Sequence, residues 1–202
     1  MKLYFSPGAC SLSPHIALLE AGLSYESVLV DLKAHKLADG TDYYTISPKG
    51  YVPLLELDNG ERLSEGPAIV QYIADQAPAK NLAPANGTMA RYRLQEALNF
   101  ISTELHKGIG GLFNPAMPDE AKALMRARGL MRLQWVNEQL EGRPYLMGDT
   151  FTVADAYLFT VANWTAHVGI DRSALTNLEA YMARVAARPA VQAAMKVEGL
   201  IK

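Results

Sequence analysis

The chain contains one cysteine, Cys10, in a position that suits a reactive thiol. Lys2 to Phe5 have strand character, a Pro-Gly turn follows, and apolar residues then recur at helical spacing. Cys10 is therefore expected just before a helix, where the helix dipole and unpaired N–H groups favour a thiolate. Cysteines in such places have a pKa of roughly 3.5 to 7.5 instead of about 8.5. A small buried hydrophobic residue is the alternative, and the position alone leaves both interpretations open.

A second group of polar residues lies in the predicted long helix from Thr88 to Leu112. Asn99, Thr103 and His106 are spaced i, i+4 and i+7, so they share one face of that helix. Three glycines follow, each costing about 1 kcal/mol relative to alanine in a helix: Gly108, Gly110 and Gly111. Glycines here either leave room for another group or mark a kink. A solvated helix face has the same composition, so a binding role stays a hypothesis.

Two further motifs stand at the starts of predicted elements. Val52-Pro53 opens a strand, where proline is tolerated because it is not required to donate to the ladder. Glu65-Gly66-Pro67 opens a helix, and the Glu65 carboxylate is placed either to cap that helix or to bind an ammonium group. The four histidines show no metal-ligand spacing with one another or with Cys10, so no metal site is predicted.

The elements that must position these residues fall into two domains. The strand and helix patterns in residues 1–78 predict a compact α/β domain of order βαβ and then ββα, with a mostly polar loop from Lys33 to Lys49. Ser11 and Ser13 are expected as N-caps of the first helix, and Gly22 as its end.

Residues 79–87 read as a linker, and residues 88–202 as an all-helical domain. The predicted helices of that domain cover Thr88 to Leu112, Pro118 to Leu140, Ala156 to Val168, about Leu178 to Ala187, and a last short helix to Met195. Thr152 and Asp155 form a capping-box pattern before the third of these helices, with Asp in place of the usual Glu or Gln.

Composition excludes several classes of function. The net charge of the 202-residue chain is −2 and no dense Lys/Arg run occurs, so neither nucleic acid nor an anionic membrane is predicted as a partner. No apolar run approaches the ~20 residues that span a bilayer, and a cytoplasmic location is expected. Because there is one cysteine, an intramolecular disulfide is impossible, and a second thiol for redox chemistry must come from outside.

Taken in order, the motifs resemble the cytosolic glutathione transferases, and within them the bacterial beta class. They are Ser6-Pro7-Gly8-Ala9-Cys10-Ser11, Gly50-Tyr51-Val52-Pro53, Glu65-Gly66-Pro67-Ala68-Ile69, the stretch from Asn99 to Lys107, Thr152 to Asp155, and the closing Glu198-Gly199-Leu200. The resemblance covers the whole chain. It implies an α+β protein with a thioredoxin-like N-terminal domain that binds glutathione as co-substrate. It also implies a helical domain that lines the pocket for a small hydrophobic electrophile, and a homodimer.

The resemblance also assigns roles to residues. Cys10 and His106 would be catalytic, Cys10 lying against the glutathione sulfur. Val52, before a cis Pro53, would pair its backbone with the tripeptide. The remaining glutathione-binding residues would be Glu65 and Gly66 at the γ-glutamyl end, Thr103 and Lys107 from the long helix, Asn99 or Glu104 towards the neighbouring subunit's glutathione, and His35 or Lys36 at the glycine carboxylate. Similar sequences often carry Lys where His35 stands and Ser where Gly66 stands.

Two kinds of activity follow from these roles. The first is conjugation by attack of the glutathione thiolate, and the second is disulfide reduction through a mixed disulfide at Cys10. The alternatives are a glutathione-dependent reductase, dehalogenase or isomerase, and a non-catalytic ligand-binding protein with the same fold.

Overall fold

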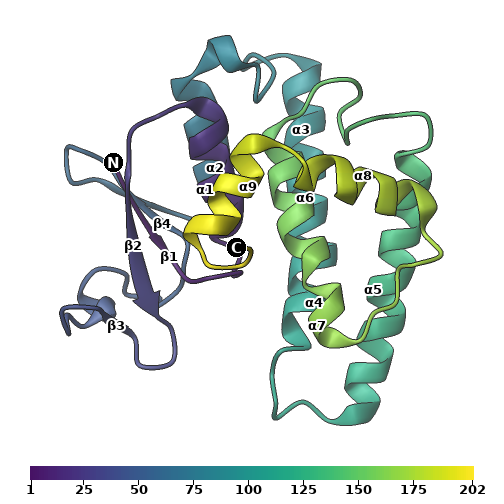
Figure 1. Cartoon of the computed structure of the whole chain (residues 1–202), viewed down its shortest axis with the longest axis horizontal. Helices are drawn as coiled ribbons and strands as arrows, with labels where there is room; N and C mark the ends of the chain where they lie inside the picture. Colours follow the sequence, from purple (N-terminus) through teal and green to yellow (C-terminus); the bar gives the residue numbers. More distant parts are fainter. The chain divides into compact units, whose positions relative to one another are not determined.

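The computed structural model describes all residues from 1 to 202, which divide into two compact units. The N-terminal unit comprises Met1–Ala83 and Pro189–Lys202, and the helical unit comprises Pro84–Arg188. The sequence analysis expected residues 88–202 to form the helical domain. The C-terminal segment Pro189–Lys202 belongs instead to the N-terminal unit. The reason is packing: α9 (Pro189–Val197) lies against α1 (Leu12–Ala21) and buries Val191 and Ala194 (Figure 1).

The N-terminal unit contains a five-stranded mixed sheet of order β3-β2-β1-β4-β5. Its strands are β1 (Lys2–Phe5), β2 (Glu26–Asp31), β3 (Lys36–Leu37), β4 (Leu54–Glu56) and β5 (Arg62–Ser64). β1 and β2 are parallel and the other pairs are antiparallel, as a βαβ unit followed by a hairpin requires. The predicted order is therefore confirmed. The two-residue β3 and the 3₁₀ turn Tyr43–Thr45 lie in the predicted loop, because such short segments carry no periodicity.

The two faces of the sheet are covered differently. α1 and α2 (Gly66–Gln76) pack together on one face of the sheet (Figure 1). Leu3 and Leu55 are paired on adjacent strands and belong to this face, and both are fully buried. On the other face Tyr4, Val30 and Leu54 form a second buried cluster. Tyr43 and Val52 close that cluster, so the loop that carries Val52 is anchored in the core.

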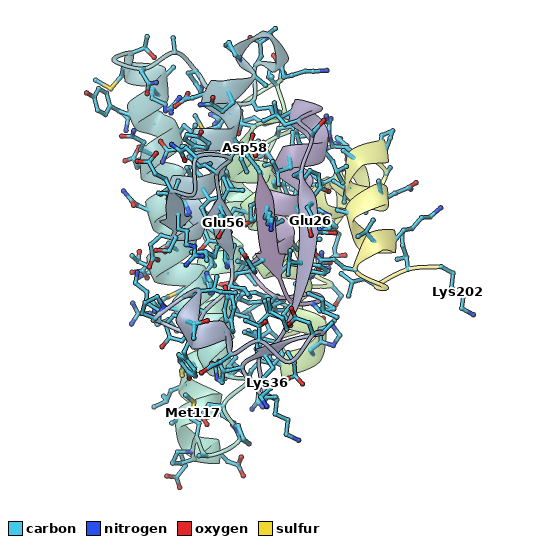
Figure 2. All side chains as sticks on the ribbon, turned by 90° about the vertical axis from the view of Figure 1, so that its left-hand side faces the viewer. Glu26, Lys36, Glu56, Asp58, Met117 and Lys202 are labelled. Carbon is cyan, nitrogen blue, oxygen red and sulfur yellow. The ribbon has the colours of Figure 1, made fainter.

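Opposite charges lie on adjacent strands at one end of the sheet. Lys2 is paired with Glu26 on one neighbouring strand and with Glu56 on the other, and Glu56 is paired with Arg62. Arg62 Nε lies 2.8 Å from Glu56 Oε2, and Lys2 Nζ lies 3.9 Å from Glu26 Oε2 (Figure 2 labels both glutamates). Opposite charges in adjacent strands favour this register over a shifted one.

The helical unit contains α3 (Met89–Phe100), the π-helical segment η3 (Ile101–His106), α4 (Lys107–Gly111), α5 (Asp119–Gln139), α6 (Val153–Asn163), α7 (Thr165–Val168) and α8 (Thr176–Ala186). The predicted long helix is thus interrupted by a π-helical turn, which frequently marks a functional position in a helix. No helix in the structure combines the length and the apolar character needed to cross a bilayer.

The predicted capping box at the start of α6 is confirmed. The Asp155 carboxylate accepts hydrogen bonds from the backbone N–H groups of Thr152 and Leu146, each at 2.8 Å, and from the Tyr181 hydroxyl at 3.1 Å. Complete burial outweighs these bonds and raises the pKa of Asp155 to about 6. The same burial, with the nearby carboxylate, raises the pKa of Tyr181 well above its usual value.

Candidate functional site

Cys10 lies in the turn that leads into α1, as predicted, and its side chain is half-buried. Its Sγ donates a hydrogen bond to the Val52 carbonyl oxygen at 3.2 Å. Two expectations for this loop were wrong: Ser11 makes no side-chain cap bond, and Ser13 lies inside α1, where its hydroxyl donates to the Cys10 carbonyl oxygen at 2.9 Å. Ser11 already has helical backbone angles, φ −63° and ψ −16°, so its hydroxyl turns back to the Ser6 carbonyl oxygen at 3.2 Å. Ser11 therefore closes the Cys10 loop instead of capping α1.

The C-terminal segment supports the same loop through Glu198. The Glu198 carboxylate accepts a hydrogen bond from the Gly8 N–H at 2.9 Å and lies 2.8 Å from Nδ1 of His15. The side chains of His15 and Glu198 are fully buried. These contacts join residues more than 180 positions apart, so no local pattern in the sequence predicted them.

Val52 and Pro53 connect the loop to β4, and the bond between them is cis, as expected. Both residues are buried, but the Val52 carbonyl reaches the Cys10 thiol. The structure therefore brings Cys10, Val52 and Pro53 together at the start of α1.

Glu65 precedes α2 in a backbone conformation with φ +71° and ψ 114°, which non-glycine residues rarely adopt. Such a conformation costs on the order of 1–3 kcal/mol and is found most often at functional sites. Glu65 makes no side-chain cap bond; its Oε1 instead lies 2.8 Å from Nζ of Lys49. The carboxylate is thus directed at a cation, and Lys49 is a neighbour that the sequence analysis missed. Gly66 is the first residue of α2, so its N–H lies outside the intrahelical hydrogen bonds.

His35 and Lys36 occupy the connection from β2 into β3. His35 has a positive φ of 52°, and its ring stacks on Tyr44 with 4.6 Å between centroids. Its Nδ1 is buried without a hydrogen-bond partner, whereas Lys36 is exposed (Figure 2). Packing therefore fixes the His35 ring, whereas the Lys36 side chain extends into solvent.

In the helical unit, His106 is held by aromatic residues. Its Nδ1 lies 2.6 Å from the Tyr157 hydroxyl, and the Trp164 ring meets it edge to face at 4.9 Å. A Cβ on Gly110 would lie 3.4 Å from both the His106 and the Trp164 rings, and one on Gly111 would lie 2.7 Å from the end of Met125. Two of the three glycines therefore adjoin side chains of their own unit.

Glu104 on η3 binds two arginines of α5, Arg132 at 2.8 Å and Arg128 at 3.1 Å. Hydrogen bonds from these guanidinium groups lower the pKa of Glu104. The Thr103 hydroxyl donates to the Asn99 carbonyl oxygen at 3.0 Å. The other predicted side chains of this stretch are exposed: Asn99, Thr103 and Lys107.

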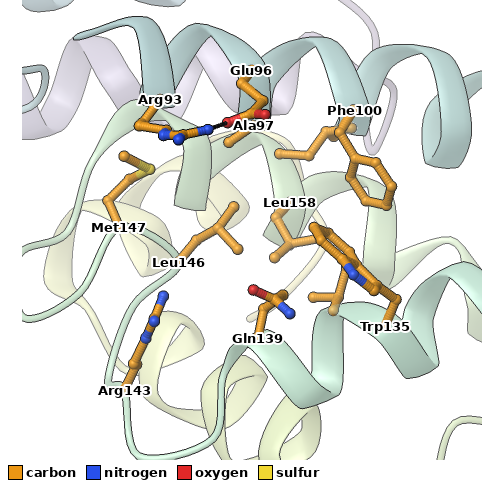
Figure 3. A pocket seen from close by; sticks show the side chains of 12 residues that line it. Arg93, Glu96, Ala97, Phe100, Trp135, Gln139, Arg143, Leu146, Met147 and Leu158 are labelled. Atoms are coloured by element: carbon orange, nitrogen blue, oxygen red, sulfur yellow. Dashed lines mark hydrogen bonds and ion pairs between the residues drawn. The ribbon is translucent and has the colours of Figure 1, made fainter. Parts of the chain in front are cut away.

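A pocket of about 630 Å³ in the helical unit contains none of the predicted residues. Figure 3 shows the Phe100 and Trp135 rings on one side, 4.6 Å between centroids, with Leu158 beside them. The ion pair of Arg93 and Glu96, at 2.7 Å, lies at the other end. The lining offers no nucleophile, so the chemistry is not placed there. Across the whole chain, no three His, Cys, Asp or Glu side chains are arranged to hold a metal ion.

Comparison with known proteins agrees with this fold. The family models described as "Glutathione S-transferase, N-terminal domain" and "Glutathione S-transferase, C-terminal domain" match residues 8–76 and 100–189. Glutathione S-transferase GstA of Escherichia coli O157:H7 is 47% identical over 200 residues, which cover 99% of this chain and 100% of that protein.

Two solved structures extend the comparison, each aligned over 100% of both chains with a TM-score of 0.96. A sphingomonad glutathione S-transferase complexed with glutathione is 51% identical, and the bacterial beta class enzyme of Sphingomonas chungbukensis is 50% identical. The chain belongs to the glutathione S-transferase family. Within that family it is a bacterial beta-class enzyme.

Proposed function

We propose that this transferase conjugates the thiol of glutathione to small hydrophobic electrophiles, with glutathione bound at the N-termini of α1 and α2. The observation that carries the proposal is the Cys10 thiol 3.2 Å from the Val52 carbonyl, directly before α1. Helix N-termini attract anions, so they suit the thiolate and carboxylates of the tripeptide. The glutathione complex of the sphingomonad relative supports this choice of ligand.

Each part of glutathione has a candidate partner in the N-terminal unit. The peptide backbone would pair with Val52 as an added strand. At the γ-glutamyl end the α-ammonium would replace Lys49 on the Glu65 carboxylate, and the α-carboxylate would accept the Gly66 N–H. The glycine carboxylate would take a donor from His35 or from Lys36.

Residues of the helical unit complete the proposal. His106 would donate to the glutathione thiolate, and Thr103 and Lys107 would supply further polar contacts. Asn99 or Glu104 would reach the glutathione of a neighbouring subunit. Of these two residues Asn99 is the better candidate, because the Glu104 carboxylate already forms ion pairs with two arginines.

In conjugation, the glutathione thiolate attacks the electrophilic carbon, a C–S bond forms, and the leaving group departs with its bonding electrons. A thiol at Cys10 stabilises that thiolate by turning its S–H from the Val52 carbonyl to the ligand sulfur. In disulfide reduction, the Cys10 thiolate instead attacks a glutathione mixed disulfide, forms its own S–S bond with glutathione and releases the other thiol. A second glutathione thiolate then attacks Cys10–S–S–glutathione, which restores Cys10 and produces glutathione disulfide.

A homodimer and a cytoplasmic location belong to the same proposal. On α3, Met89 and Tyr92 are 70% and 57% exposed, and an isologous contact would cover them. The single cysteine suits a reducing compartment, where thiols persist. Light scattering at micromolar concentration tests the dimer, and a monomeric mass would contradict it.

Calorimetric titration with glutathione, followed by turnover assays with an aryl halide and with a glutathione mixed disulfide, tests the proposal. We expect saturable binding and turnover of the aryl halide. Binding without turnover of either substrate would show a ligand-binding protein, and turnover of the disulfide alone would show a reductase. A crystal structure of the complex that places glutathione away from Cys10 and Val52 would refute the proposed site.

A further inference from the structure

We propose that Tyr157 is a positioning residue for the reaction: its hydroxyl donates to Nδ1 of His106, which places the imidazole proton on Nε2. His106 then acts as a hydrogen-bond donor to the glutathione thiolate and not as a base. The inference rests on the proposed role of His106.

The first observation is the distance between the two groups. The Tyr157 oxygen lies 2.6 Å from Nδ1 of His106. Hydrogen bonds donated by O–H groups are generally shorter than those donated by N–H groups, and N–H···O bonds are most often about 2.9–3.0 Å long. The short contact therefore favours the tyrosyl O–H as donor and Nδ1 as acceptor.

The second observation is burial. Tyr157 lies in α6 and is 2% exposed. A buried hydroxyl that does not donate loses a large part of its hydration free energy, so a donated bond to His106 is favoured. A neutral imidazole has one N–H, so a lone pair at Nδ1 requires the proton at Nε2.

The third observation is the fixed orientation of the ring. Tyr157 and Trp164 both meet the His106 ring edge to face, at 5.8 and 4.9 Å between centroids. On a third side, the hypothetical Cβ of Gly110 is 3.4 Å from Cδ2 of His106, so the backbone lies close there as well. With the ring held on these sides, the hydroxyl determines which nitrogen carries the proton.

The variant Tyr157→Phe removes the hydroxyl and keeps the ring that packs on His106. We expect kcat for conjugation to fall about 3- to 10-fold, the range that loss of one neutral hydrogen bond gives, with KM for glutathione within about twofold. The loss should disappear in the His106→Ala background, because Tyr157 acts through His106. An equal loss in that background, or no loss in the single variant, would overturn the proposal.

Nitrogen-15 NMR of the histidine rings reads the proton position without any assay of activity. We expect Nδ1 of His106 to show the shift of an unprotonated nitrogen in the native enzyme and an intermediate shift in Tyr157→Phe. If the native enzyme carries the proton on Nδ1, the proposal is overturned. This holds even if loss of conjugation in His106→Ala shows that His106 is needed for the reaction. Full activity of His106→Ala would instead refute the proposed catalytic role, and with it the consequence for the reaction.

Tyr181→Phe is the matched control. Tyr181 is also a buried tyrosine of the helical unit, and its hydroxyl donates to Asp155, not to His106. We expect this variant to lower the unfolding midpoint and to leave the His106 nitrogen shifts and kcat unchanged. A shift of the His106 nitrogens in Tyr181→Phe would show that any loss of a buried hydroxyl disturbs the ring, which would overturn the specific role of Tyr157.

Discussion

The proposed site residues of the two units are positioned in different ways. In the N-terminal unit the recognition groups are largely backbone groups at the ends of elements: the Val52 carbonyl, and the Gly66 N–H at the start of α2. Glu65 and His35 hold positive φ values there. In the helical unit they are side chains held by other side chains, His106 by Tyr157 and Glu104 by two arginines of α5.

This difference indicates where substitutions matter. A backbone group keeps its direction when its own side chain changes, provided that the local conformation survives. A side chain on a helix keeps its direction only while its partner is present. Glutathione binding and turnover should therefore tolerate most conservative changes in the N-terminal unit, except at Cys10 and Glu65. In the helical unit they should depend on the residues that support the site side chains.

The largest effect is expected at Cys10, the one reactive side chain of the N-terminal part. Cys10→Ala should abolish reduction of a glutathione mixed disulfide, because the relay needs the protein's sulfur. Conjugation should stay within about tenfold, roughly 1.4 kcal/mol of barrier, since glutathione brings its own thiol. Cys10→Ser is the control, as its hydroxyl still donates, and it should conjugate at least as well as the alanine variant. Unchanged reductase turnover of Cys10→Ala would show that Cys10 is only structural.

The next largest effect is expected on stability, at Asp155. Asp155→Asn replaces one acceptor oxygen by an NH₂ group that faces the Thr152 N–H, and each buried donor left unpaired costs about 1–3 kcal/mol. Urea unfolding should show a lower midpoint for the helical unit. A midpoint equal to that of the native protein would show that the capping box adds little.

Asp155 also gives a pH dependence with an unusual sign. Burial raises its pKa in the folded protein from 3.8 to about 6, so the folded state binds its proton more tightly than the unfolded state. The contribution of this group to stability is thus greatest below about pH 4 and decreases as pH rises to about 6. The difference in unfolding free energy between the native protein and Asp155→Asn, measured from pH 4 to 7, isolates this group. A difference that grows in favour of the native protein over that interval would contradict the assignment.

A smaller effect is expected at Glu65. Glu65→Gln should raise the Kd for glutathione about tenfold. This is near the smallest effect expected for loss of a charge-assisted hydrogen bond, because the carboxylate is exposed to solvent.

Val52→Ala tests the backbone side of the comparison: it should lower stability but leave the Kd for glutathione within about twofold. A large rise in Kd for Val52→Ala would mean that its side chain, and not its carbonyl, recognises the ligand.

The smallest effect is expected at Glu104. Arg128 is exposed, whereas Arg132 and Glu104 are half-buried, and ion pairs that solvent still reaches contribute little to stability. Glu104→Gln should leave both the unfolding midpoint and kcat within experimental error, in contrast to Tyr157→Phe. A clear fall in kcat would show that Glu104 takes part in the reaction.

Local patterns in the sequence predict the order of the main elements, the capping box at Thr152 and Asp155, and the position of Cys10 before α1. These features depend on hydrophobic periodicity and on Pro, Gly and capping residues, which act within a few positions of the chain. The resemblance to a family added the cis bond before Pro53 and the list of site residues, whose roles stay predictions.

The partners of the site residues depend on tertiary packing. Packing brings the Glu198 carboxylate into contact with Gly8 and His15, so the C-terminal segment belongs to the N-terminal unit. It also paired Glu65 with Lys49 and His106 with Tyr157, and it turned the Ser11 hydroxyl back to Ser6. These contacts depend on which surfaces meet when the helices and the sheet pack. A local pattern carries no information on that choice, because residues far apart in sequence become neighbours only when a common core is buried.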